Sequence, residues 1–323
     1  MALEPLVPDE MLHEPTTAGG SLEAALDGGI ANDGDASPQA LSRGQLVWRR
    51  FRRNRAGMGG IFVLGALFVL AFVGPHLTQW SYEDIDPNAF LKPPSSTHWF
   101  GTTQIGQDVF AQTMRGLQKS LVIGLLVGVI STSIAALVGA TAGYFGSWVE
   151  NVNLFTVSLL LVLPDFLILA IISPRLHDSS WLWFVLLLSI FSWTLTALVI
   201  HSLTLSLKQR EFVHAARFMG VPSRTIIARH ILPNMASFLI IDATITVGAA
   251  VLLETGLSYF GFGIQPPDVS LGTLIADGTA SALTFPWLFL FAGGFLVVMV
   301  LAVSVIGDAL RDAVDPQSRA RAS

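Results

Sequence analysis

The chain has 323 residues, of which 52% are hydrophobic and only 13% are charged, and its mean hydropathy is +0.61. Soluble globular domains carry roughly 25% charged residues, so this composition excludes an ordinary soluble protein and predicts a membrane protein. The absence of cysteine excludes disulfides, thiolate metal sites and a cysteine nucleophile. The net charge of −5 is unevenly spread, so its distribution is more informative than its sum.

The first 42 residues form an acidic segment. They contain eight acidic residues, no Lys or Arg, and many Gly, Ala and Pro, so they cannot bury a core. We therefore expect residues 1–42 to be a disordered acidic tail, whose role the sequence does not indicate. The segment lacks the basic start, the apolar stretch and the small-residue cleavage site of a signal peptide.

Apolar runs that can cross a membrane follow this tail. A spanning helix needs about 20 residues, and six runs satisfy this, at 58–79, 120–143, 150–172, 181–204, 236–258 and 285–307. Five arginines crowd the approach to the first run, namely Arg49, Arg50, Arg52, Arg53 and Arg55. Because basic residues stay on the cytoplasmic side, we expect both termini inside, an arrangement that places 14 of the 18 Lys and Arg residues inside.

The segment 104–119 precedes the second span and carries apolar residues at helical spacing. These residues are Phe110, Met114 and Leu117, and the series continues to Leu121. The pattern predicts an amphipathic helix that leads into the span. Such a helix either lies on the membrane surface or packs against the helix bundle or a partner, and the pattern does not separate the two.

A basic insert at 211–234 separates the fourth and fifth spans and is the most informative part of the sequence. Its first half places small and apolar residues on one helical face, namely Phe212, Ala215, Ala216 and Met219. Small alanines between larger apolar anchors let another protein approach closely, which predicts a docking surface. The alternative is an amphipathic helix resting on the cytoplasmic leaflet, with arginines meeting anionic lipid.

Three residues mark the end of this exposed helix. Gly220 suits the position just after a helix C-terminus, Pro222 cannot continue the helix, and Ser223 can cap a second one. We expect that second helix at about 224–232, stopping at Pro233 before the fifth span. The insert is therefore predicted to be a helix-turn-helix.

Ionisable residues occur within the predicted spans, at Asp165, His201 and Asp242, with Glu254 near the end of the fifth. A group at this depth usually faces a bundle interior or a watery cavity, so Asp165 and Asp242 are candidates for lining a substrate pathway. The alternative is an interhelical hydrogen bond or a protonated acid, and Glu254 also suits a solvated interface. Pro164 predicts a kink in the third span.

No motif for ATP hydrolysis or hydrolase chemistry is present. The sequence lacks G-x-x-x-x-G-K-[ST], G-x-S-x-G and H-E-x-x-H. We therefore expect no enzymatic activity, no catalytic residue, no metal site and no cofactor in this chain, and no nucleic-acid partner. Any ATP and Mg would be bound by separate ATPase subunits.

Five residues of the insert match a known pattern at the correct spacing, namely Ala215, Ala216, Gly220, Leu232 and Pro233. This pattern resembles the EAA loop of bacterial ABC importer permeases, although His214 and His230 replace its usual Glu and Ile. Both replacements are usual in the peptide-permease branch of that family.

Three further segments resemble the C-type subunit of oligopeptide and dipeptide permeases. They lie at 254–278 after the fifth span, at 98–110 in the first external loop, and at 307–316 near the C-terminus. Within the external loop, Thr103 and Gln107 stand where an Asp and an Arg are more typical. The similarity covers roughly residues 43–318 and leaves out the acidic tail.

The resemblance implies an all-α membrane protein with six transmembrane helices, similar to type I ABC importer permeases, with both termini cytoplasmic. The permease domain would occupy 43–318, with a coupling loop at 208–234 and a cytoplasmic tail at 319–323. In that family a coupling helix sits in a groove of the ATPase. This role falls on Glu211, Ala215, Ala216 and Gly220, to which the helical face adds Phe212 and Met219.

The resemblance also implies an importer of oligopeptides or dipeptides in the bacterial inner membrane. Its partners would be a second homologous permease chain, two ATP-binding subunits, an extracytoplasmic peptide-binding protein and membrane lipid. Peptide length, glutathione, haem and metal chelates stay open as substrates. A proton-coupled secondary transporter using Asp165 or Asp242 is the alternative function, but it gives the insert no role. A membrane scaffold without a transport pathway is a third possibility.

Overall fold

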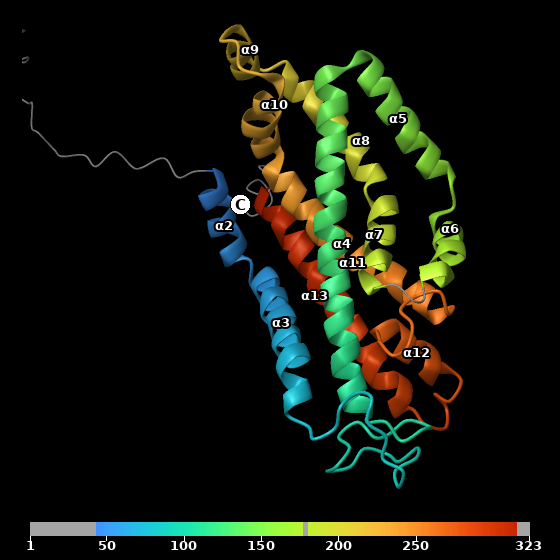
Figure 1. Ribbon diagram of the computed structural model, residues 1–323. Helices are drawn as coiled ribbons and strands as arrows, with labels where there is room; N and C mark the ends of the chain where they lie inside the picture. Colours follow the sequence, from blue (N-terminus) through green and yellow to red (C-terminus); the bar gives the residue numbers. More distant parts are fainter. Residues whose placement is uncertain (1–42, 177–179, 315–323) are drawn as a thin grey trace, which may run out of the picture. The chain divides into compact units, whose positions relative to one another are not determined.

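The computed structural model of the chain describes residues 43–176 and 180–314, which form a bundle of helices (Figure 1). Apart from two isolated bridges, no β-structure occurs among them, which confirms the all-α class. The longer helices are α2 (Arg43–Arg53), α3 (Arg55–Val73), α4 (Val109–Phe145), α5 (Ser147–Val162), α6 (Asp165–Ile172), α7 (Trp181–Ser192), α8 (Thr194–Lys208), α9 (Glu211–Phe218), α11 (Ala236–Tyr259), α12 (Leu271–Thr279) and α13 (Trp287–Val314). Shorter helical pieces are Gly74–His76, Ser173–Leu176, α10 (Ser223–Ile226), Ile227–Ile231 and Leu232–Met235. The predicted tails at 1–42 and 319–323 lie outside the described residues.

Four helical runs are long and apolar enough to cross a membrane by themselves, namely Arg55–His76, Val109–Phe145, Ser223–Tyr259 and Trp287–Val314. The helices α5 and α6 form a bent pair with an angle of 79°, and α7 and α8 form another with an angle of 48°. The described residues therefore provide four spans, or up to six if each bent pair crosses once. The predicted kink at Pro164 is confirmed, because α5 ends at Val162 and α6 begins at Asp165.

The bend between α7 and α8 was not predicted. It falls at Trp193, where neither proline nor glycine interrupts the sequence. The hydroxyl of Ser192 donates to the carbonyl of Leu188 over 2.9 Å, and such bonds to the preceding turn compete with the helical ladder and bend helices. Hydropathy does not register this effect, because the run remains apolar on both sides.

The long helix α4 lies at the centre of the bundle. It begins at Asp108, whose side chain accepts from the backbone N–H of Ala111, and runs for 37 residues, about 55 Å at ~1.5 Å per residue. Its first turns bury Phe110, Met114 and Leu117, of which Phe110 packs on loop residues Trp99 and Phe100 and Leu117 joins a cluster with α3, α11, α12 and α13. The amphipathic helix predicted at 104–119 therefore starts later, is continuous with the span and packs into the bundle rather than lying on the membrane.

Glycines let α4 approach two neighbouring helices closely. Added Cβ atoms at Gly124 and Gly128 would meet α11, and a Cβ at Gly139 would lie only 2.6 Å from the carbonyl oxygen of Ala197 in α8. Gly143, one turn further, would place its Cβ 2.8 Å from the carbonyl oxygen of His201. Small residues at a spacing of four are a general device for packing helices in membranes, where the hydrophobic effect does not bring helices together.

The prediction that the second helix of the insert stops at Pro233 is wrong. The chain continues from α10 through the π-helical turn Ile227–Ile231 and the 3₁₀ turn Leu232–Met235 directly into α11. In the wide turn the N–H of Leu232 donates to the carbonyl of Ile227, five residues earlier. This shift of the hydrogen-bond ladder accommodates Pro233, which has no N–H, so the helical run Ser223–Tyr259 continues instead of ending there.

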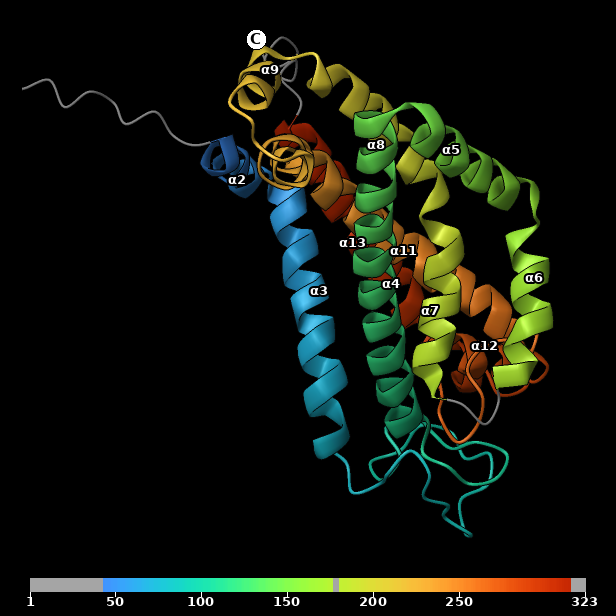
Figure 2. The ribbon, with the colours of Figure 1, turned by 45° about the horizontal axis from the view of Figure 1, so that its top comes forward.

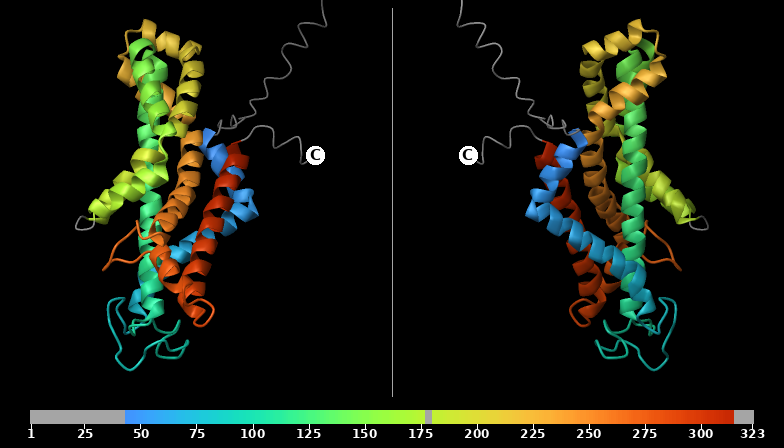
Figure 3. Two further views of the ribbon diagram at one scale, coloured as in Figure 1. Left: turned by 90° about the vertical axis from the view of Figure 1, so that its right-hand side faces the viewer. Right: turned by 90° about the vertical axis from the view of Figure 1, so that its left-hand side faces the viewer.

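The two ends of the bundle carry different elements. The views in Figures 1, 2 and 3 agree that α9, α10 and the C-terminal end of α4 lie at one end, and that the loop 77–108 lies at the other. At the α9 end, α2 packs on the last turns of α13, where Phe51 is buried beside Ala309 and Ala313. This arrangement gives the bundle one end with the predicted coupling loop and an opposite end with the long loop 77–108.

We predict that Gly139→Ala lowers the stability of the bundle, because its Cβ would collide with backbone of α8. Overpacking of this kind costs about 1–3 kcal/mol in the free energy of unfolding. Gly294→Ala is a matched control on α13, because a Cβ there meets nothing within 4 Å. Thermal unfolding of the purified chain in detergent measures both variants. Equal midpoints would contradict the role assigned to the contact between α4 and α8.

Candidate coupling site and polar groups of the bundle

The predicted helix-turn-helix is confirmed in its first half. The helix α9 ends with the N–H of Met219 donating to the carbonyl of Ala215, and Gly220 follows at φ +75°. The N–H of Val221 donates back to the carbonyl of Ala216, which completes a helix C-terminus of the Schellman kind. The expected cap at Ser223 is wrong, because no side chain caps α10, which starts after Pro222.

The exposed face of α9 differs from the predicted one. Val213 and Ala216 are each 1% exposed and pack into the core, whereas Phe212, Ala215 and Met219 face outward. The expectation that Ala216 lies on the exposed face is therefore wrong. Successive residues of a helix are rotated by ~100°, so Val213 and Ala216, three positions apart, lie on one stripe, and that stripe faces the bundle.

Phe218 is the residue of this face that the sequence analysis missed. Its side chain is 90% exposed, compared with 75% for Met219 and 40% for Phe212. The exposed stripe thus carries three large apolar side chains around Ala215, and Glu211 is exposed at its start. A helical projection centred on Ala215, instead of on the pair of alanines, includes Phe218.

The buried stripe of α9 anchors it to the end of α4. Val213 and Ala216 belong to a cluster that also contains Tyr144, from the last turn of α4. The guanidinium carbon of Arg217 lies 5.5 Å from the centre of the Tyr144 ring, and Lys208 Nζ lies 5.9 Å from it. Cation–π contacts of this length attract. The exposed apolar face of α9 is therefore held by contacts with the last turn of α4.

Asp242 forms interhelical hydrogen bonds. Its two carboxylate oxygens accept from the hydroxyls of Thr132 in α4, over 2.9 Å, and of Thr196 in α8, over 2.8 Å. Because Asp242 itself belongs to α11, the carboxylate joins three helices. These contacts match the structural alternative for this residue, in which an intramembrane acid orders the packing.

Asp165 lies apart from Asp242. It is exposed at the first turn of α6, and its Oδ1 accepts from the backbone N–H of Phe166 over 2.7 Å. Among the described residues, no hydrogen bond or ion pair connects the two acids. The structure therefore does not bring the two proposed pathway residues into one site, although Asp165 occupies the break between α5 and α6.

The remaining intramembrane candidates are also held by side chains of the bundle. His201 Nε2 lies 2.8 Å from Oε1 of Glu150, which links α8 to α5. Glu254 is fully buried, so the alternative of a solvated interface is wrong for it. Its Oε1 accepts from the hydroxyl of Ser258 over 2.6 Å, whereas Oε2 has no partner among the described residues.

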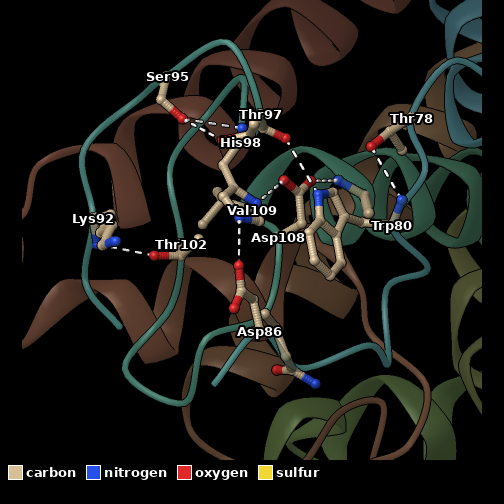
Figure 4. Close-up of polar contacts among 12 residues, drawn as sticks. Thr78, Trp80, Asp86, Lys92, Ser95, Thr97, His98, Thr102, Asp108 and Val109 are labelled. Atoms are coloured by element: carbon tan, nitrogen blue, oxygen red, sulfur yellow. Dashed lines mark hydrogen bonds and ion pairs between the residues drawn. The ribbon is translucent and has the colours of Figure 1, made fainter. Parts of the chain in front are cut away.

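The loop 77–108 is organised around a buried histidine, as Figure 4 shows. His98 Nδ1 lies 2.9 Å from Asp108 Oδ2, its Nε2 lies 3.4 Å from Asp86 Oδ2, and Trp80 stacks on the imidazole ring. The backbone N–H of Asn88, and then His98, hold the pKa of Asp86 below its ordinary value. No spacing rule in the sequence brings these residues together, because the loop has no regular structure.

Comparison with known proteins identifies the family. The family described as "Binding-protein-dependent transport system inner membrane component" matches residues 135–320. The family described as "N-terminal TM domain of oligopeptide transport permease C" matches residues 42–94.

Individual relatives cover most of the chain. An oligopeptide transport system permease protein OppC of Mycobacterium tuberculosis is 55% identical over 279 residues, which is 86% of this chain and 96% of that protein. A putative peptide permease protein of Brucella suis is 39% identical, covering 83% of this chain and 89% of its own length. The dipeptide transport system permease protein DppC of Bacillus subtilis is 34% identical, covering 87% and 88%. The chain therefore belongs to the family of binding-protein-dependent transport system inner membrane components, the permease subunits of ABC importers.

Proposed function

We propose that this chain is one of two homologous permease subunits of an ATP-driven importer that moves oligopeptides or dipeptides across a bacterial inner membrane. The observation that carries this proposal is α9, an exposed apolar helix face anchored to α4, in a chain of this family. The relatives named as oligopeptide and dipeptide permeases support the peptide substrate. Two ATP-binding subunits bind ATP and Mg, and an extracytoplasmic binding protein delivers the peptide.

The proposed topology has six spans, with each bent pair crossing the membrane once. Both termini then lie in the cytoplasm, together with α9. The five arginines of residues 49–55 support this orientation, because basic residues stay on the cytoplasmic side. The proposed permease domain is 43–318 with its coupling loop at 208–234.

The proposed mechanism moves α9 as a rigid body. Glu211, Phe212, Ala215, Met219 and Gly220 contact a groove of the ATPase, and Phe218 joins them. Ala216 acts from the other side of the helix, where it holds α9 against the bundle. When ATP closes the two ATPases, α9 carries the end of α4 with it, and the bundle switches between inward-facing and outward-facing forms.

The proton-coupled secondary transporter has less support. Both oxygens of Asp242 accept hydrogen bonds from threonine hydroxyls, so the carboxylate has a structural role already. Asp165 is exposed at the break after Pro164 and stays a proposed pathway residue. The exposed helix α9 also has no role in such a transporter.

We predict that Ala215→Glu releases the ATP-binding subunits. Ala215 is exposed, so the substitution breaks no contact within the chain but places a charge in the proposed interface. A disruptive substitution at the centre of a protein–protein interface typically costs more than ~2 kcal/mol of binding free energy, which lowers the affinity more than about tenfold. Co-purification of the ATP-binding subunits with the permease from mild detergent measures this loss. Ala56→Glu, the same change at an exposed alanine of α3, is the matched control. Retention of the ATPases by Ala215→Glu would contradict the docking surface.

We also predict that Gly220→Val impairs ATP-driven uptake and that Gly220→Asn preserves most of it. The φ of +75° at Gly220 costs a β-branched residue about 1–2 kcal/mol or more, whereas Asn tolerates this region. A Cβ at Gly220 meets nothing within 4 Å, so the effect acts through the backbone that ends α9. Uptake per permease in the membrane is the measurement. Equal loss in both variants would show that φ at this position does not matter.

A further inference from the structure

Two cations share one carboxylate at the end of α4 opposite α9. Arg115 Nη2 lies 3.1 Å from Asp268 Oδ1, and Lys119 Nζ lies 2.9 Å from Asp268 Oδ2. The cations are one turn apart on α4, and Asp268 belongs to the connection between α11 and α12. Within the described part of the chain no second carboxylate pairs with either cation. The cluster therefore carries one positive charge that it does not neutralise, and the Lys119 side chain is only 9% exposed.

The cations also have donors to spare. A guanidinium has five N–H groups and an ammonium has three. Arg115 Nη1 donates to Gln118 and Nη2 to Asp268, but Nε is buried and lacks a partner among the described residues. Lys119 Nζ donates to Asp268 and lies 4.5 Å from the centre of the Trp181 ring. The Arg115 side chain as a whole is 31% exposed, so the rest of its guanidinium can meet a ligand, and a cation beside an unneutralised positive charge favours an anionic oxygen.

A hollow of about 440 Å³ borders Arg115 and Gln118. Three aromatic side chains contribute to its wall, namely Phe72, Trp80 and Tyr82. Asp84 also lines it, and one oxygen of its carboxylate accepts the backbone N–H of Ser81 over 2.7 Å. The wall of the hollow therefore combines aromatic side chains with polar and charged ones. The cation thus has space beside it for a ligand that carries both apolar and charged parts.

We propose that Arg115 binds the C-terminal carboxylate of a peptide that enters this hollow from the end of the bundle opposite α9, while Lys119 holds the Asp268 carboxylate that the two cations share. This inference rests on the proposed function, in which the substrate is a peptide and this end of the bundle faces the extracytoplasmic side. The incoming carboxylate competes with Asp268 for the Arg115 guanidinium and loosens the tie between α4 and the connection after α11. The subsite recognises a group that all free peptides share, so it leaves side-chain selection to the binding protein.

The test compares one peptide in two forms, with a free C-terminal carboxylate and with a C-terminal amide. ATP-driven uptake of both is measured in vesicles that hold the complete importer with its binding protein. The binding protein has its own preference between the two, but that preference is the same for every permease variant. The ratio of acid uptake to amide uptake therefore isolates the contribution of the permease.

We expect Arg115→Gln to lower this ratio roughly tenfold, which corresponds to one charge-assisted hydrogen bond. Arg115→Lys retains the charge and should retain most of the ratio. Lys92→Gln removes another cation from the same end and serves as the matched control. If Arg115→Gln does not accumulate in the membrane, Lys119→Gln is measured in its place, because it leaves Asp268 paired with Arg115 alone and should also lower the ratio.

Each outcome decides the proposal. A ratio that stays constant while both uptakes fall in parallel overturns the subsite and leaves the cluster as a structural tie. Loss of uptake in vesicles without anionic lipid, with a constant ratio, also overturns it, because a lipid phosphate then occupies the cations. Absence of peptide uptake by the unaltered chain contradicts the proposed function, whereas a constant ratio with active uptake contradicts the subsite alone.

Discussion

The close approach of α4 to α8 and α11 is the constraint on which the rest of this structure depends. Lipid tails are as apolar as leucine side chains, so helices gain little from leaving lipid unless their atoms pack at short range. Gly139 and Gly143 have no side chain, which lets α8 pack closely on α4. Gly124 and Gly128 let α11 pack closely on α4 in the same way. A bundle built this way keeps α4 at its centre, and the other elements are placed relative to it.

The same packing explains the hydrogen bonds of Asp242. A carboxylate in a bundle is tolerated when neighbouring helices supply donors, and the close approach places Thr132 and Thr196 within 2.9 Å of its oxygens. The bonds then fix the rotation of three helices about their axes, which apolar contacts alone specify poorly. A polar residue at depth is therefore not sufficient evidence for a transport pathway, because helix packing also requires such residues.

Hydropathy and breaker residues predicted the helical class, the kink at Pro164 and the turn at Gly220, because those features depend on local chemistry. The sequence analysis placed the buried Ala216 on the exposed face and missed the exposed Phe218, because the buried stripe of a short helix depends on the surface it packs on. The continuation past Pro233 depends on a shifted hydrogen-bond ladder that no composition reveals. The Asp268 cluster joins residues about 150 positions apart, and the His98 cluster forms in a loop without regular structure, so only tertiary structure could show them.

The unbroken length of α4 matters for how motion passes through the bundle. Its last turn is held to α9 through Tyr144, and its first third is tied to Asp268 through Arg115 and Lys119. An intact helix of 37 residues bends little, so a displacement imposed at one end reaches the other. The pairs α5–α6 and α7–α8 are interrupted, with angles of 79° and 48°, and their breaks offer hinges. In the mechanism proposed above, rigid and hinged elements side by side convert a displacement of α9 into a change of the opening at the opposite end.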